Sequence, residues 1–149
     1  MTRIPQPQFT LIGKRHAKLI SPYDAGNFEV PAGFEFDGAT IPWFVWSLIR
    51  LSPFDTIVGP ACGHDFLYVT CGRVLGWDGR PLYYTEKQSD EYFYRRCQAT
   101  NVEMSWLQER AVRRAVIWFG DYDVDKRSDV YNWNTKMIED YLERYRASI

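Results

Sequence analysis

The fold is decided by one stretch of sequence, Gly59-Pro60-Ala61-Cys62-Gly63-His64-Asp65-Phe66-Leu67-Tyr68. It places a histidine and a carboxylate side by side in an otherwise apolar run, where packing requires neither. If the stretch is a helix, one face carries four residues at i, i+3, i+4 and i+7: Ala61, His64, Asp65 and Tyr68. This stripe indicates a functional site. The alternative is a core histidine bonded to a neighbouring helix, with Asp65 capping or exposed.

A second carboxylate, Asp90, lies on a predicted helix further along the chain. Thr85 and Gln88 have the spacing of a capping box, which predicts where that helix starts. Asp90 then shares an apolar face with Phe93, Tyr94 and Cys97. Burying an unpaired carboxylate costs desolvation free energy on the order of several kcal/mol, so we expect a cation, a metal or a histidine beside it. His64 is the obvious partner.

The N-terminal part is predicted to form a small antiparallel meander. Its β-prone runs are residues 9–12, 17–20, 28–30 and 34–36. Residues 21–27 form a turn cluster between them. His16 lies in a polar hairpin-like segment without an acidic neighbour in sequence, so we expect a solvated loop residue and not a ligand.

Asp37 is a carboxylate that can enter the site from the sheet. It stands just before Gly38 at the end of the last predicted strand, where a backbone can approach a ligand closely. An alternative role for Asp37, which the sequence favours equally, is an Asx-turn that caps the following residues. The next segment, Trp43–Ile49, is an apolar helix that we interpret as buried in the core, although it would also suit a contact surface.

The C-terminal part is predicted to be helical. Asp78-Gly79 is a turn signal that predicts a projecting hairpin between residues 74–77 and 81–84. Helices follow over about 107–119 and 134–145, and the last one turns Met137, Ile138, Tyr141 and Leu142 inward. We therefore predict one α+β domain over residues 1–149. A small N-terminal antiparallel β-sheet (about 8–37) packs on a helical half of about four to five helices (about 42–147).

Composition limits the classes of function. The 149 residues are 46% hydrophobic, 25% charged and 17% aromatic, with six Trp and ten Tyr, and that aromatic share suits flat contacts with partners or ligands. The formal net charge of −1 and the lack of a block of Lys or Arg argue against nucleic acid as a partner. The sequence does not determine the oligomeric state.

The cysteines and the N-terminus predict where the protein is made. Cys62, Cys71 and Cys97 form no C-x-x-C pair, which is typical of small apolar residues in a reducing compartment. The proline-broken start has no apolar signal segment, and no run reaches the length of a transmembrane span. We expect synthesis in the cytoplasm.

Three segments together resemble a known family. They are Val30-Pro31-Ala32-Gly33-Phe34 leading through Asp37-Gly38-Ala39-Thr40-Ile41-Pro42, then His64-Asp65-Phe66-Leu67-Tyr68, then Ser89-Asp90-Glu91-Tyr92-Phe93. In this order and spacing, over roughly residues 28–120, they are similar to the phage and prophage family called domain of unknown function 1353. The resemblance implies a phage or prophage origin and a polar signature of Asp37, His64, Asp65 and Asp90, without an assigned activity.

A second resemblance is local. His64-Asp65-x-x-Tyr68 on one helix, with Asp90 on the next, resembles the site of secreted calcium-dependent phospholipases. It implies that His64 activates water, that Asp65 holds calcium, and that Asp90 and Tyr68 orient the histidine. The chain departs from those enzymes because it lacks their glycine-rich calcium loop and their cysteine framework.

Two functional hypotheses follow. In the first, the protein is a metal-dependent hydrolase in which His64, Asp90 and Tyr68 form the catalytic group. Asp65 and Asp37 would hold calcium or another divalent cation, and the substrate would be envelope lipid, cell wall or a phosphoester.

In the second hypothesis the protein is a non-enzymatic tail, baseplate or assembly component. The same polar cluster would then be a structural hydrogen-bond network, and the aromatic content and the projecting hairpin would serve phage structural or assembly partners in the virion. A solvent-connected cleft at His64 favours the first hypothesis, whereas a sealed network favours the second.

Overall fold

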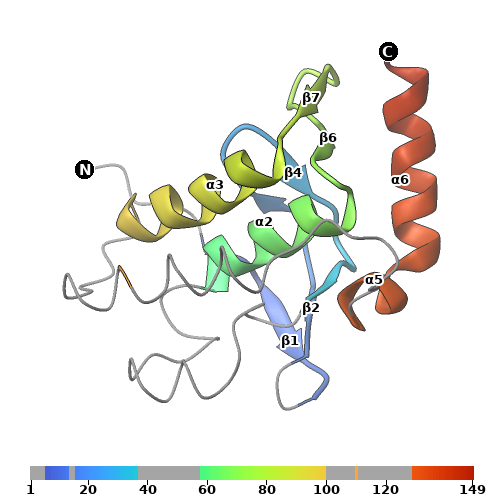
Figure 1. Cartoon of the computed structure of the whole chain (residues 1–149). Coiled ribbons are helices and arrows are strands. Elements are labelled where there is room, and N and C mark those ends of the chain that lie inside the picture. The colour runs from blue at the N-terminus through green and yellow to red at the C-terminus, as the bar shows by residue number, and fades with distance from the viewer. Residues whose placement is uncertain (1–5, 14–15, 37–57, 100–109, 111–128) are drawn as a thin grey trace.

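The computed structural model describes residues 6–13, 16–36, 58–99, 110 and 129–149, which form α+β structure as predicted. Short antiparallel strands make up the N-terminal part, and helices dominate the C-terminal part (Figure 1). The predicted helices at 43–49 and 107–119 lie outside the described residues, apart from Arg110, which is helical. Within the described residues, no helix is both long and apolar enough to span a membrane.

The first sheet confirms three of the predicted runs. Strands β1 (Phe9–Leu11), β2 (Ala17–Leu19) and β5 (Glu35–Phe36) form an antiparallel sheet in the order β1-β2-β5. In β2, Ala17 and Leu19 are buried while Lys18 is exposed, as expected for the two-residue period of a strand with one covered face.

A second pair of strands corrects the predicted turn at 21–27. β3 (Tyr23–Asp24) pairs with β4 (Glu29–Val30), so the turn is shorter than the sequence suggested. The turn itself lies at Ala25–Phe28, where Gly26 has φ 109° and donates its N–H to Asp24 Oδ1 at 2.9 Å. The buried Tyr23 side chain stabilises the strand, and a two-residue strand has no periodic signal in sequence.

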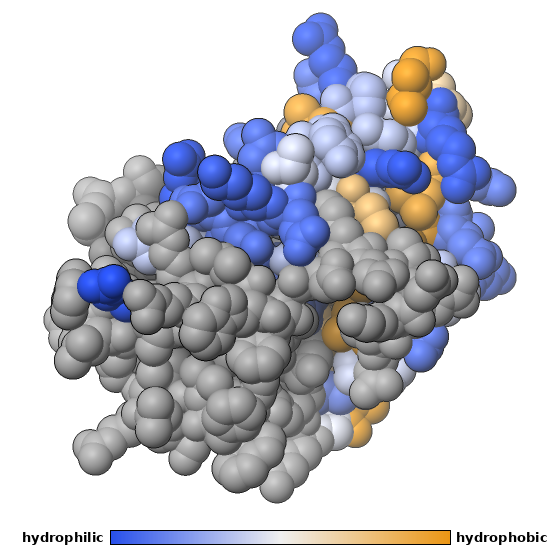
Figure 2. Space-filling model, in the orientation of Figure 1, coloured by the Kyte–Doolittle hydropathy of each residue, from blue (hydrophilic) through white to orange (hydrophobic). Residues whose placement is uncertain are grey.

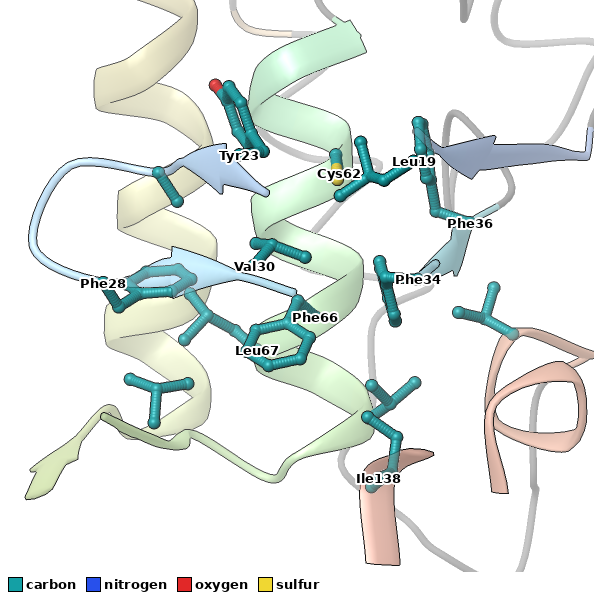
Figure 3. Packing of buried hydrophobic residues seen from close by; sticks show 14 of the residues in the cluster. Leu19, Tyr23, Phe28, Val30, Phe34, Phe36, Cys62, Phe66, Leu67 and Ile138 are labelled. Atoms are coloured by element: carbon teal, nitrogen blue, oxygen red, sulfur yellow. The ribbon is translucent and has the colours of Figure 1, made fainter. Parts of the chain in front are cut away.

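Helix α2 (Val58–Val69) is the central element and confirms the predicted helix. Figure 3 shows its Cys62, Phe66 and Leu67 side chains within the apolar core, near Phe28 and Phe34 of the strand region. The Phe66 ring packs edge-on against Phe34, with centroids 5.2 Å apart. All of these side chains are fully buried, so the core lies between α2 and the sheets.

Helix α2 ends in a Schellman motif. The Gly72 N–H donates to the Leu67 carbonyl at 2.8 Å, and the Cys71 N–H donates to the Tyr68 carbonyl at 3.1 Å. Cys71 and Gly72 have φ of 51° and 76°. The sharp reversal leads directly into strand β6 (Arg73–Leu75).

The predicted hairpin and capping box are both present. β6 pairs with β7 (Pro81–Tyr83) around a turn in which Gly79 has φ 78°, and the hairpin projects at the top of Figure 1. Helix α3 (Glu86–Ala99) follows. The Thr85 N–H donates to Gln88 Oε1 at 2.9 Å, and the Gln88 N–H donates to Thr85 Oγ1 at 3.1 Å.

Helices α5 (Asp129–Trp133) and α6 (Thr135–Ala147) close the described structure. The predicted inward face of α6 is confirmed, because Ile138 and Tyr141 are buried while Met137 and Leu142 pack against the core. The Tyr141 hydroxyl accepts the Leu75 N–H at 2.7 Å. This bond ties α6 to the β6–β7 hairpin.

Candidate functional site

Two neighbouring helices build the candidate site. α2 and α3 run side by side in opposite directions, as the colours of Figure 1 show. They can approach closely because Gly63 has no side chain. A Cβ at that position would collide with the Tyr92 ring and hydroxyl.

Asp90 joins the two helices as the sequence predicted. Its Oδ1 lies 3.0 Å from His64 Nε2, and the Tyr68 hydroxyl donates to the same oxygen at 2.6 Å. An ionised Asp90 only accepts hydrogen bonds, and with such an acceptor the contact requires a proton on Nε2. The structure thus brings together all three residues that were predicted to be catalytic.

The imidazole is also held by its ring neighbours. The Tyr68 ring centroid is 4.4 Å from that of His64, and the Phe93 ring meets His64 edge-on at 5.3 Å. His64 is 1% exposed, and the Asp90 side chain is 12% exposed. The ring therefore has a fixed position, and Asp90 is the more accessible end of the pair.

Asp65 follows His64 directly on α2. It is 2% exposed. Burial, and to a smaller extent the charge of Asp65, raise the pKa of the Cys62 thiol well above its usual value. The thiol therefore stays protonated in the core and does not provide a nucleophile.

The predicted metal ligands are only partly described. Asp65 is among the described residues, whereas Asp37 lies outside them. Among the residues with described positions, no three His, Cys, Asp or Glu side chains converge as a metal-binding group. The divalent-metal site at Asp65 and Asp37 therefore stays a prediction.

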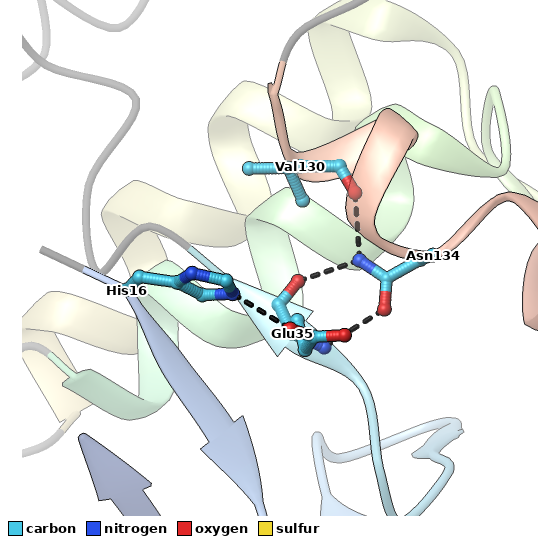
Figure 4. A network of polar contacts seen from close by, with 4 residues as sticks. All are labelled: His16, Glu35, Val130 and Asn134. Atoms are coloured by element: carbon cyan, nitrogen blue, oxygen red, sulfur yellow. Dashed lines mark hydrogen bonds and ion pairs between the residues drawn. The ribbon is translucent and has the colours of Figure 1, made fainter. Parts of the chain in front are cut away.

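The prediction of a solvated His16 is wrong. Its ring stacks on Trp133, with centroids 3.5 Å apart and planes 10° apart, and its Nε2 lies 2.8 Å from Glu35 Oε1 (Figure 4). The two atoms are close, but their geometry falls short of a good hydrogen bond, and the contact is an ion pair only when His16 is protonated. No local pattern predicts this contact, because Trp133 comes from the opposite end of the chain.

Asn134 fixes the backbone on which Glu35 sits. Its amide nitrogen donates to the Glu35 carbonyl at 2.6 Å and to the Val130 carbonyl at 2.7 Å. Its Oδ1 accepts the Glu35 N–H at 2.8 Å, so one side chain satisfies both backbone groups at the free edge of β5 (Figure 4). The Asn134 bonds therefore hold the start of α6 on strand β5, and the contact between His16 and Glu35 lies beside them.

Sequence reasoning missed the other face of α3. There, the Arg96 guanidinium lies 6.0 Å from the Tyr92 ring centroid and 3.4 Å from the Tyr23 hydroxyl. Tyr92 donates its hydroxyl to the Ala25 carbonyl at 2.9 Å. The i, i+4 spacing of Tyr92 and Arg96 was the available signal, because it places an aromatic ring and a cation on one helix face.

A family model described as "Protein of unknown function (DUF1353)" matches residues 16–120 of the chain. The matched range contains every residue predicted for the site: Asp37, His64, Asp65, Tyr68 and Asp90. Comparison with curated proteins and with solved structures found no match.

Proposed function

This chain belongs to the DUF1353 family, and from that premise we propose that it is a hydrolase in which His64 activates a water molecule. One observation carries the proposal: a single oxygen of Asp90 faces both the imidazole of His64 and the hydroxyl of Tyr68. A carboxylate that orients an imidazole in this way is a recurring arrangement for a general base.

The chemistry follows from the positions of the three side chains. Asp90 holds the proton on His64 Nε2, so Nδ1 is the nitrogen that would take a proton from water, and this step requires water to reach a ring that is 1% exposed. The charge of Asp90 stabilises the imidazolium that forms, while Tyr68 fixes the carboxylate. A positioned general base of this kind contributes about 10²-fold to 10⁴-fold to a rate.

The metal and the substrate class complete the proposal. Asp65 supplies carboxylate oxygen, the ligand that calcium and magnesium prefer, and Asp37 would supply a second such ligand. A bound divalent cation would polarise the carbonyl or phosphoryl group of the substrate. Within a phage or prophage, the target would be an ester or phosphoester of the host envelope or cell wall.

A second candidate function rests on the burial of the same residues. His64 and Asp65 are 1% and 2% exposed, which suits a sealed network that ties α2 to α3. The protein would then be a non-enzymatic tail, baseplate or assembly component, incorporated into the virion.

The variants His64→Gln and Asp90→Asn distinguish the two candidates. Wild type and variants are incubated with phospholipid vesicles, cell-wall fragments and a soluble phosphodiester, with calcium and after its removal by a chelator. A hydrolase loses about 10²-fold or more of its activity in both variants while remaining folded.

The matched control is His16→Gln, which changes the other histidine of the chain and should retain the activity. If wild type cleaves none of these substrates and His64→Gln unfolds several degrees earlier, the structural candidate replaces the hydrolase.

A further inference from the structure

A groove of about 930 Å³ lies on the face of α3 that does not carry Asp90. Its walls come from three segments: the turn between β3 and β4, strand β7, and helix α3. The size is within the range of pockets that hold small organic ligands. Figure 2 shows strongly hydrophilic residues gathered over α3.

The groove is positively charged. Lys87, Arg95 and Arg96 line it together with only one carboxylate, that of Glu91. Among the described residues, none of these three cations forms an ion pair with a carboxylate. The lining therefore carries three positive charges against one negative charge, and the charge of Asp24 also acts on Arg96 from beside the groove. An anionic ligand would gain from the remaining positive charge.

Arg96 has a donor without an acceptor. Its Nε is buried and has no hydrogen-bond partner among the described residues. Its Nη2 reaches the Tyr23 hydroxyl and the Asp24 carbonyl only at 3.4 Å. A buried unpaired donor is costly, and the planar fork of a guanidinium matches two oxygens of a phosphate.

Aromatic rings form the other part of the wall. Tyr83, Tyr84 and Tyr92 all line the groove, and Tyr83 is 61% exposed. Beside them, Trp77 donates its indole N–H to the Gly26 carbonyl at 2.9 Å, and the residue is 55% exposed. Exposed rings next to cations are typical of sites that stack a base or a sugar while binding its phosphate.

We propose that this groove binds a small ligand that carries a phosphate group and a ring, the chemical class of nucleotides and sugar phosphates. Arg95 and Arg96 hold the phosphate, and Tyr83 packs against the ring. The proposal is independent of hydrolysis at His64, because it uses neither His64 nor Asp90.

Calorimetric titration with three probes tests the ligand class. Adenosine monophosphate carries both features, inorganic phosphate carries the anion alone, and adenosine carries the ring alone. We expect adenosine monophosphate to bind at least ten times more tightly than either of the others, and its affinity to fall as salt is raised. Absence of binding by all three probes at millimolar concentration would overturn the proposal.

Variants test the site. Arg96→Gln is expected to weaken binding of adenosine monophosphate at least tenfold, whereas Lys136→Gln, an exposed cation on α6, leaves it unchanged. Tyr83→Ser removes the preference for adenosine monophosphate over inorganic phosphate. Equal weakening by Arg96→Gln and Lys136→Gln would mean non-specific charge attraction and would refute the site.

A separate pair of variants protects the test against misfolding. If Arg96→Gln does not fold by circular dichroism, the exposed Arg95→Gln and Lys87→Gln take its place. Each is expected to weaken binding severalfold. Unchanged affinity in both would contradict the proposal.

Discussion

The two faces of helix α3 differ in whether their buried polar groups have hydrogen-bond partners. Toward α2, Asp90 is largely buried and its Oδ1 is shared by two donors, from His64 and Tyr68. Toward the β3–β4 turn, Arg96 keeps a buried nitrogen that has no hydrogen-bond partner among the described residues, at the edge of an open groove. The Asp90 face, where the polar groups are satisfied, therefore has a fixed geometry. The Arg96 face, where a donor is unsatisfied, can still form a hydrogen bond with a ligand.

Replacing Asp90 by alanine should give the largest loss of stability. The change leaves the His64 ring nitrogen and the Tyr68 hydroxyl without their shared acceptor, and each buried donor left unsatisfied costs about 1 to 3 kcal/mol. Urea denaturation measures the free energy of unfolding.

The matched control is Lys87→Ala, an exposed residue of the same helix on the groove face, with an expected change within about 0.5 kcal/mol. Equal losses in Asp90→Ala and Lys87→Ala would remove the contrast between the faces.

A tyrosine from each face gives a finer comparison. Tyr68→Phe deletes the hydroxyl that donates to Asp90, and a hydrogen bond to a charged group is worth about 1.5 to 3 kcal/mol. Tyr83→Phe on the groove face should change the free energy of unfolding by less than about 0.5 kcal/mol, because Tyr83 is mostly exposed. Thermal and urea unfolding of both variants provide the measurement. A larger loss in Tyr83→Phe would reverse the assignment of the two faces.

High pH should weaken the junction between α3 and the β3–β4 turn. Burial raises the pKa of Tyr92 well above its usual value of about 10, and burial also raises the pKa of Tyr23. Above pH 10 the unfolded chain loses phenolic protons that the folded protein retains. Stability is therefore complete below pH 10 and falls above it, by at most about 1.4 kcal/mol per pH unit for each phenol.

Urea denaturation between pH 8 and 11.5 measures this effect. Tyr92→Phe should be less stable than wild type at pH 8, because it loses the bond to the Ala25 carbonyl. It should also lose less stability than wild type as the pH rises. Parallel pH profiles for the two proteins would contradict the role given to Tyr92.

Local sequence signals predicted that His64, Tyr68 and Asp90 would lie together. The i, i+3, i+4 and i+7 stripe placed His64 and Tyr68 on one side of α2, and the cost of burying Asp90 identified its partner. The Thr85–Gln88 capping box located the start of α3. These inferences succeeded because each depends on residues within one or two turns of a helix, or on a pairing demanded by burial.

The remaining features depend on contacts between distant segments. Asn134 bonds to Glu35 across 99 positions, and the Trp133 ring covers His16. The groove is formed by three segments that are separate in sequence. Periodicity and propensity describe neighbours along the chain, so they carry no information about such contacts.

The protonation of the His64 ring nitrogens decides whether Asp90 orients the histidine. Nitrogen-15 NMR of labelled protein at neutral pH distinguishes the two nitrogens, and we expect a proton on Nε2, directed at Asp90. In Asp90→Asn this preference for Nε2 should weaken, because the amide can also donate. A wild-type ring that carries its only proton on Nδ1 would contradict the account, because Asp90 would then not be the acceptor that orients the histidine.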